Sequence, residues 1–114
     1  MSGEAESWVT VEKDRGSSWA RIVLCREPVN SMNFAFWQRL SEVLHTCEQT
    51  EDIRGVIFCS GLKKPVFTAG NDLGELYAPA TSRERYRRFW KMSNEFLCNL
   101  YMSPLLTVAA VRGA

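Results

Sequence analysis

The run Pro65-Val66-Phe67-Thr68-Ala69-Gly70-Asn71-Asp72-Leu73 joins a strand-like segment, residues 54–60, to a short polar-capped segment that ends near Tyr77. A glycine beside a small residue, an amide and a capping Asp indicates a backbone turn that can lie against a ligand. At the start of a helix such a turn leaves main-chain N–H groups unpaired, and these can hold a negatively charged oxygen. Considered alone, however, the run is slightly better explained as an ordinary strand-to-helix connection.

The chain opens with two segments of strand character. Residues 8–13 and 19–25 have the pattern of half-buried strands, and residues 14–18 between them are turn formers, which predicts a hairpin. Residues 1–7 are short and acidic, and they resemble neither a signal peptide nor a transit peptide. We expect residues 1–7 to form a disordered tail.

A helix is expected after the hairpin. Pro28 ends the second strand, and the N-cap candidates are Asn30, Ser31 and Asn33. The helix should reach about Glu48, because apolar side chains recur at helical spacing along one face. That face comprises Phe36, Trp37, Leu40, Val43, Leu44 and Cys47.

Two further apolar runs indicate buried strands, at residues 54–60 and 105–111. A second long helix is expected between them, since Thr81 and Glu84 have the spacing of a capping box and Pro104 prevents its continuation. Its apolar face comprises Tyr86, Phe89, Trp90, Ser93, Phe96, Leu97 and Leu100. A helix between two such strands makes a parallel crossover connection.

The order strand, strand, helix, strand, loop, helix, strand is typical of an α/β layer structure. A chain of 114 residues forms one domain at most. The last strand is followed at once by residues 112–114, which begin a turn at the edge where ligand sites of open α/β sheets lie. The sequence therefore predicts that residues 1–114 are the amino-terminal part of a single larger domain.

Composition argues against several classes of protein. The formal net charge of +1 gives no electrostatic basis for binding nucleic acid, and no apolar run approaches the roughly 18 residues that span a bilayer. The four cysteines form no C-x-x-C pair, and His45 is the only histidine, so we expect no metal site. The cysteines are interpreted as small apolar side chains in a reducing compartment.

Four motifs, taken in order, resemble the crotonase superfamily, which is the enoyl-CoA hydratase/isomerase superfamily. They are Pro28-Val29-Asn30-Ser31, Ile53-Arg54-Gly55-Val56-Ile57, Phe67-Thr68-Ala69-Gly70-Asn71-Asp72-Leu73 and Val108-Ala109-Ala110-Val111-Arg112-Gly113-Ala114. The resemblance covers nearly the whole chain from about Trp8, and it is greatest to the delta-3,delta-2-enoyl-CoA isomerases of fatty-acid β-oxidation. It implies the amino-terminal portion of a crotonase-like ββα spiral fold, a hairpin followed by βαβ units.

The resemblance also implies a site for acyl-CoA, formed by Thr68, Ala69, Gly70, Asn71 and Asp72. The backbone N–H of Asn71 is then one of two donors to the thioester carbonyl oxygen, in an oxyanion hole. The backbone of Ala69 lies against the adenine end of a folded CoA. Donors preorganised around an oxygen that gains charge, as it does when an enolate forms, are typically worth about 3–4 kcal/mol each.

In this family the second donor and the catalytic carboxylates lie beyond the positions that match Gly113 and Ala114. The chain is therefore expected to hold half an oxyanion hole and no general base, and to be inactive alone. Glu75 follows the loop, and we expect it to be a solvated helix residue. An enoyl-CoA isomerase would move one proton between C2 and C4 of the thioester with a single Glu. The alternatives are a hydratase with two carboxylates, a non-catalytic crotonase-like protein that binds acyl-CoA or a partner, and an inactive truncated product.

The resemblance implies no metal or redox cofactor, because the CoA thioester is itself the substrate. Relatives assemble as trimers or paired trimers, so a homo-oligomer is expected, a trimer or a hexamer. A role in β-oxidation implies the mitochondrial matrix, with the peroxisome as the alternative. These residues indicate neither the preferred acyl-chain length nor the choice between isomerase and hydratase.

Overall fold

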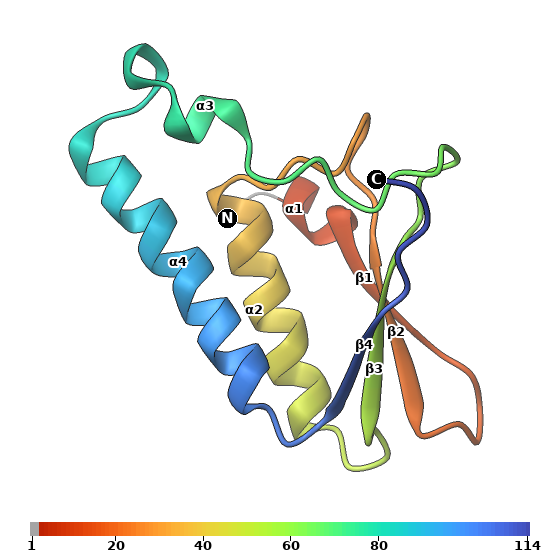
Figure 1. The fold of residues 1–114 in the computed structure, drawn as a ribbon. Coiled ribbons are helices and arrows are strands. Elements are labelled where there is room, and N and C mark those ends of the chain that lie inside the picture. The colour runs from red at the N-terminus through yellow and green to blue at the C-terminus, as the bar shows by residue number, and fades with distance from the viewer. Residues whose placement is uncertain (1–2) are drawn as a thin grey trace.

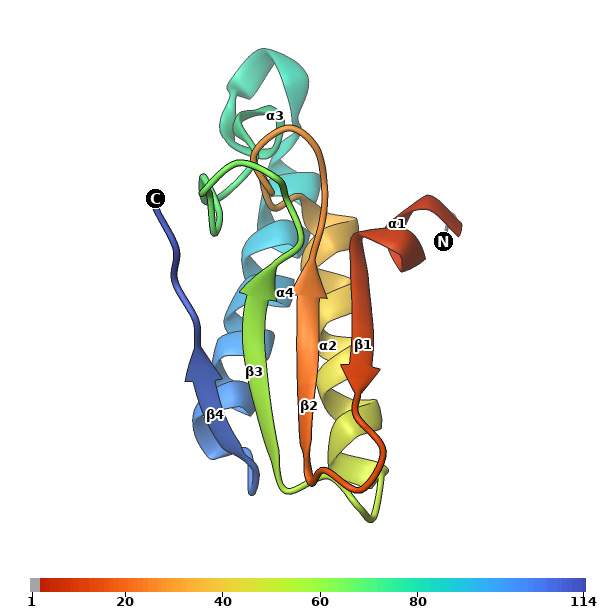
Figure 2. The ribbon, with the colours of Figure 1, turned by 90° about the vertical axis from the view of Figure 1, so that its right-hand side faces the viewer.

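The computed structural model describes residues 3–114, which form a four-stranded sheet with two long helices packed on one face (Figure 1). Figure 2 shows the sheet with both helices behind it. The elements are α1 (Gly3–Trp8), β1 (Val9–Lys13), β2 (Trp19–Leu24), α2 (Phe34–Gln49), β3 (Gly55–Ser60), α3 (Leu73–Leu76), the 3-10 helix η1 (Ala78–Ala80), α4 (Arg83–Met102) and β4 (Leu106–Ala109). The predicted α/β layer structure is confirmed.

The strands lie in the order β1-β2-β3-β4. β1 and β2 form the predicted antiparallel hairpin, in which Val9 lies opposite Leu24. β2 pairs with β3, and β3 with β4, in parallel, so α2 and α4 are the crossover helices of two βαβ units. The carboxyl ends of β2 and β3 therefore meet at the same edge of the sheet, where open α/β sheets place their ligands.

Helix α2 matches its prediction closely. Its N-cap is Asn33, whose Oδ1 accepts a hydrogen bond from the N–H of Phe36 (2.9 Å). All six side chains of the predicted apolar face are buried, and they pack against sheet residues such as Ile22 and Val56. A fully buried Leu or Phe side chain stabilises a fold by about 1.5–3 kcal/mol, so this face anchors α2 on the sheet.

The start of helix α4 differs from the predicted capping box. The N-cap is Ser82, whose Oγ accepts the N–H of Arg85 (3.1 Å), whereas Thr81 ends η1 and Glu84 lies in the first turn. The prediction was wrong because adjacent Thr and Ser are both good caps, and the local pattern does not choose between them. The predicted apolar face is correct for Phe89, Ser93 and Phe96, which are buried, but Tyr86 and Leu97 are exposed.

The amino-terminal segment is a helix, which corrects the prediction of a disordered tail over residues 1–7. Within α1 the side chain of Ala5 is fully buried, and the ring of Trp8 stacks on Phe36 with 6.3 Å between centroids. Acidic composition predicted a solvated tail, but it does not reveal that Ala5 is buried and that the adjoining Trp8 packs on Phe36 of α2. Residues 1–2 of the predicted tail lie outside the described residues.

Strand β4 is exposed, which corrects the prediction of a buried strand at residues 105–111. Every residue of Leu106–Ala109 is exposed to solvent. The strand lies at the edge of the sheet and pairs only with β3, and the elements of residues 3–114 leave its side chains uncovered. An apolar run shows that a strand is suited to burial, but it does not supply the element that buries it.

Candidate functional site

The run 67–72 lies at the edge where β2 and β3 end, beside the segment that follows β2 (Figure 2). The N–H of Met32 donates to the carbonyl oxygen of Gly70 (2.8 Å), and the N–H of Asp72 donates to the carbonyl oxygen of Met32 (2.9 Å). These bonds form a parallel β-bridge between Met32 and Asn71. Residues 70–72 are therefore held against Met32 like a very short extra strand.

Asn71 presents its backbone N–H away from this bridge. In an extended segment the peptide groups of successive residues point to alternate sides. The Gly70 carbonyl and the Asp72 N–H face Met32, and the Asn71 N–H donates to no group among residues 3–114. The side chain of Asn71 is engaged, because its Oδ1 accepts the indole N–H of Trp37 (3.0 Å). The bond to Trp37 fixes the side chain, and the main-chain N–H of Asn71 is left free to donate to a ligand.

Thr68 and Gly70 shape the turn before Asn71. Thr68 Oγ1 donates to the carbonyl oxygen of Asn30 (2.7 Å) and accepts the N–H of Gly70 (3.0 Å). Gly70 has φ +90°, a conformation that L side chains rarely adopt, although an added Cβ would meet no atom within 4 Å. Backbone conformation rather than crowding therefore requires glycine here. Between them, the N–H of Ala69 donates to the Val29 carbonyl oxygen (2.9 Å).

Asn30 joins the parts of this site. Its side chain is fully buried, and its Nδ2 donates to the carbonyl oxygens of Leu24 (3.1 Å) and Phe67 (2.9 Å) and to Ser60 Oγ (3.2 Å). Its Oδ1 accepts the N–H of Arg26 (2.6 Å). Asn30 thus connects the ends of β2 and β3 to the run. From the sequence, Asn30 is an N-cap candidate and part of the motif Pro28-Val29-Asn30-Ser31, and neither predicts these bonds. Its φ is 55°, a conformation that Asn adopts more readily than most residues.

Asp72 caps α3 and also forms an ion pair. Its Oδ1 accepts the N–H of Gly74 (2.9 Å), and its Oδ2 lies 3.0 Å from Nη1 of Arg26. Burial raises the pKa of Asp72, but the bond from Gly74 and the attraction of Arg26 outweigh burial and hold the pKa below its ordinary value of 3.8. Arg26 is fixed in turn by the carbonyl oxygen of Ser31 (2.7 Å) and by the ring of Trp8, whose centroid is 4.5 Å away.

Glu75 is buried, which corrects the prediction of a solvated helix residue. Only 2% of its surface is exposed. Its Oε2 accepts the N–H of Phe34 in the first turn of α2 (2.7 Å), and its Oε1 accepts Nε–H of Arg85 on α4 (2.7 Å). Glu75 therefore ties α3 to both long helices. Its partners lie on other elements of the chain, so no local pattern around Glu75 could have revealed them.

The residues at 113–114 lie against the start of the run. The N–H of Phe67 donates to the carbonyl oxygen of Ala114 (2.5 Å), and the N–H of Ala114 donates to the carbonyl oxygen of Pro65 (3.3 Å). A Cβ at Gly113 would lie 1.6 Å from the Pro65 carbonyl oxygen, and φ is +78° there, so only glycine fits. The backbone of the motif at 108–114 is thereby brought beside the run that carries Asn71.

Two other features bear on the chemistry. Residues 3–114 contain no group of three or more His, Cys, Asp or Glu side chains that could hold a metal ion. None of the helices in the described part of the chain is long and apolar enough to cross a membrane.

The fold and this site define a class of protein. The family model for enoyl-CoA hydratase/isomerase matches residues 14–114, from the turn of the hairpin through the run 67–72 to the last residue. The chain belongs to the enoyl-CoA hydratase/isomerase family, the crotonases, as its four sequence motifs predicted.

Within that family the chain is similar to enoyl-CoA isomerases. It is 37% identical over 106 residues to human "Enoyl-CoA delta isomerase 1, mitochondrial", which covers 93% of this chain and 34% of that protein. It is 34% identical over 101 residues to the "Fatty acid oxidation complex subunit alpha" of Shewanella loihica, which covers 89% and 14% respectively. The crystal structure of human mitochondrial delta3-delta2-enoyl-CoA isomerase aligns with a TM-score of 0.87 at 36% identity and covers 94% of this chain and 40% of that one. The chain thus spans about a third of the length of the curated isomerase it matches.

Proposed function

We propose that residues 68–72 bind the thioester group of an acyl-CoA and that the backbone N–H of Asn71 donates to the thioester carbonyl oxygen. The observation that carries this proposal is the free N–H of Asn71, whose neighbours Gly70 and Asp72 are both fixed against Met32. A donor held in place by its own backbone needs no reorganisation when charge develops on the oxygen. Such a donor typically contributes about 3–4 kcal/mol to transition-state stabilisation.

The residues around Asn71 serve the same proposed site. Thr68 holds the turn through its bonds to Asn30 and Gly70, and Asp72 caps the first turn of α3. The carbonyl oxygen of Ala69 accepts no hydrogen bond among residues 3–114, and we assign it to the adenine end of CoA. Each of these five residues thus contributes through backbone placement more than through side-chain chemistry.

The proposed reaction is the isomerisation of a 3-enoyl-CoA to a 2-trans-enoyl-CoA. A base removes a proton from C2, the electrons of that bond and of the C3–C4 double bond delocalise toward the carbonyl, and a proton returns at C4. The intermediate is a dienolate whose negative charge rests largely on the thioester oxygen, where the Asn71 N–H stabilises it. The similarity to named enoyl-CoA isomerases supports this choice.

The proposed reaction also needs a general base. Asp72 is engaged by Gly74 and Arg26, and Glu75 is buried with both oxygens bonded, so neither carboxylate is free to take the proton. We therefore propose that the base and a second donor are supplied by residues outside this sequence. The 114-residue chain is then expected to bind acyl-CoA without turnover.

A hydratase is the alternative function, because the matching family model covers both activities. A non-catalytic protein that binds acyl-CoA or a partner is the next. We further propose action in the mitochondrial matrix, since the human relative is named mitochondrial, with the peroxisome as the alternative. Assembly into a homotrimer or hexamer is proposed from family resemblance.

A semisynthetic chain tests the role of the Asn71 N–H directly. Cys59 allows native ligation of a synthetic segment 59–114 in which an ester replaces the amide N–H of residue 71. Octanoyl-CoA and free CoA are titrated by calorimetry into the ester chain and into an all-amide control. Loss of one neutral hydrogen bond should weaken octanoyl-CoA binding about three- to tenfold.

Free CoA is the internal control, because it lacks the thioester carbonyl. The ester also weakens the Gly70 carbonyl as an acceptor for Met32, and that effect should change the binding of both ligands equally. An equal loss for octanoyl-CoA and CoA would contradict the role of the Asn71 N–H. Formation of 2-trans-octenoyl-CoA from 3-octenoyl-CoA by the 114-residue chain would contradict the placement of the base outside it.

A further inference from the structure

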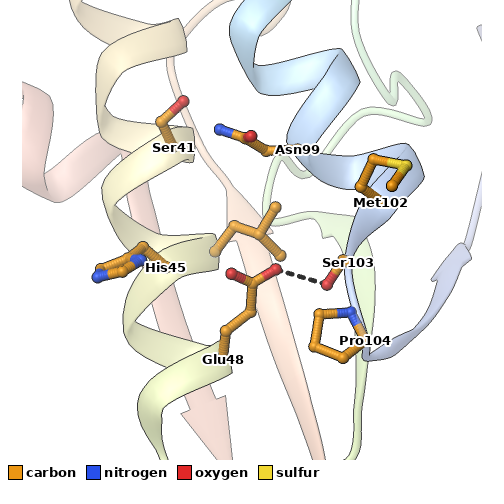
Figure 3. A pocket seen from close by; sticks show the side chains of 8 residues that line it. Ser41, His45, Glu48, Asn99, Met102, Ser103 and Pro104 are labelled. Atoms are coloured by element: carbon orange, nitrogen blue, oxygen red, sulfur yellow. Dashed lines mark hydrogen bonds between the residues drawn. The ribbon is translucent and has the colours of Figure 1, made fainter.

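A polar cavity of about 240 Å³ lies between the last turns of α2 and α4 (Figure 3). Its polar wall comprises Ser41, His45 and Glu48 of α2 and Asn99 and Ser103 at the end of α4. It lies at the carboxyl ends of these helices, whereas the proposed acyl-CoA site lies near their amino ends, beside α3 (Figure 1). The cavity is therefore separate from the proposed function.

The cavity has a negative electrostatic environment. Two helices end beside it, α2 at Gln49 and α4 at Met102, and neither has a basic residue in its last turn. The carboxyl end of a helix carries about half a negative charge, which a Lys or Arg in the last turn commonly offsets. Neither Lys nor Arg lines the cavity, while the carboxylate of Glu48 does. These three negative contributions favour a cationic ligand.

The Glu48 carboxylate is oriented, but only one of its two oxygens accepts a hydrogen bond. Its Oε2 accepts the hydroxyl of Ser103 at 2.6 Å. No hydrogen bond or ion pair among residues 3–114 reaches Oε1. Figure 3 shows the carboxylate between His45 and Ser103, on the cavity wall. Ser103 thus fixes the group and leaves one charged oxygen for a ligand.

A second unpaired acceptor lies on the same wall. Ser41 Oγ is buried and has no hydrogen-bond partner among residues 3–114. Buried polar atoms in native proteins are almost always hydrogen-bonded, so an unpaired one points to a ligand or a bound water. The side chain of Asn99 lies on the opposite helix (Figure 3). Leu44 and Met102 add apolar surface to the same cavity.

We propose that this cavity binds an alkylammonium group. The ammonium donates to Glu48 Oε1, and its alkyl stem packs on Leu44 and Met102. An ammonium has three donors and no acceptor, which matches a wall of oxygen acceptors with one full negative charge. A divalent metal ion would require several more oxygen ligands than one carboxylate supplies.

Three ligands of equal length test the charge requirement. The ¹⁵N-labelled chain is titrated with n-butylammonium, n-butanol and butyrate, and backbone amide shifts are followed by NMR. Only n-butylammonium should give saturable shifts confined to residues 41–49 and 99–104, with n-butanol at least about tenfold weaker. Equal binding of n-butanol, or shifts without saturation, would overturn the proposal.

Binding of Nα-acetyl-lysine amide as tightly as n-butylammonium would identify a lysine side chain of a partner as the source of the ammonium group. Much weaker binding of Nα-acetyl-lysine amide would identify a free amine as the source.

Variants locate the site. Glu48→Gln keeps an acceptor for Ser103 and removes the charge, and it should weaken n-butylammonium binding about tenfold. Glu42→Gln is the matched control, because it removes the same charge from the exposed side of the same helix, outside the cavity. Circular dichroism confirms that both variants are folded. If both lose affinity equally, the attraction is a general charge effect and the proposed site is wrong.

Discussion

The side-chain amide of Asn30 donates to the carbonyl oxygen of Phe67 across 2.9 Å, and thereby joins residues 37 positions apart. Asn30 is fully buried and has a positive φ of 55°. The bond places the run after β3 against the segment after β2, so the position of the free Asn71 N–H depends on Asn30. A residue that never touches the proposed thioester therefore determines where its donor lies.

Replacing Asn30 with Ala should destabilise the fold by about 3 kcal/mol. The change leaves the carbonyl oxygen of Phe67 and the N–H of Arg26 unpaired, which costs about 1–3 kcal/mol each when no water reaches them, and it places Ala at a positive φ. Urea unfolding followed by circular dichroism measures the effect. Asn30→Gly separates the two causes, because glycine also lacks the side-chain amide but adopts the positive φ without strain. A loss below about 1 kcal/mol for Asn30→Ala would show that the amide is not the connector inferred above.

Much of the fold could be predicted because its determinants are local. The apolar face of α2 follows from spacings of three and four residues, and Asn33 caps the helix as an N-cap candidate should. The hairpin and the parallel strands follow from alternation, from turn formers and from the length of the connecting helices.

The unpredicted part depends on contacts between distant elements. Glu75 stands in a short polar-capped segment, where a charged residue is usually solvated, but its partners are Phe34, 41 residues earlier, and Arg85, ten residues later. Asn30 likewise has local N-cap character, whereas its bonds to Ser60 and Phe67 arise only when β2 and β3 lie side by side. The run 67–72 can be recognised from its residues, but the free N–H of Asn71 is visible only in three dimensions.

Glu75→Ala should destabilise the fold by about 2–3 kcal/mol. The change removes a buried acceptor from the first turn of α2 and leaves Arg85 without its partner. Glu75→Gln retains one acceptor and should cost about 1 kcal/mol. Glu84→Ala is the matched control, because this exposed acid in the first turn of α4 contributes about 0.5 kcal/mol through the helix dipole. Equal losses for Glu75→Ala and Glu84→Ala in urea unfolding would contradict the connecting role of Glu75.

The stability of the fold should fall at acid pH partly through Asp72. Its pKa in the folded state lies below the ordinary value of 3.8, so its contribution is present above 3.8 and is lost as pH falls through the lower folded pKa. Asp72→Asn keeps a capping oxygen for Gly74 and should therefore show a shallower loss of stability below pH 3.8. Urea midpoints between pH 7 and pH 2 measure the slope. Asp14→Asn, at a fully exposed pair with Arg21, should change the slope less, and the opposite ranking would refute the assignment.

The cysteines should differ in their rates of alkylation. Burial raises the pKa of Cys47, and the neighbouring charge of Glu48 raises it further; burial likewise raises the pKa of Cys59. Cys98 is exposed. Since the thiolate is the nucleophile, iodoacetamide at pH 8 should label Cys98 before Cys59 and Cys47 last. Peptide mass spectrometry after timed quenching gives the order. Labelling of Cys47 as fast as Cys98 would mean that α2 is not packed on the sheet as described.

Ser41→Ala should stabilise the fold by about 0.5–1 kcal/mol, although Ser41 belongs to the α2 helix that anchors the core. The buried hydroxyl has no partner among residues 3–114, and Ala is the better helix former. Ser93→Ala is the matched control, because Ser93 is buried in α4 but its Oγ donates to the Trp90 carbonyl oxygen (3.2 Å), so its removal should be neutral or costly. Urea unfolding followed by circular dichroism measures the two changes in stability. A loss of stability on Ser41→Ala as large as that on Ser93→Ala would contradict the unpaired state of the Ser41 hydroxyl.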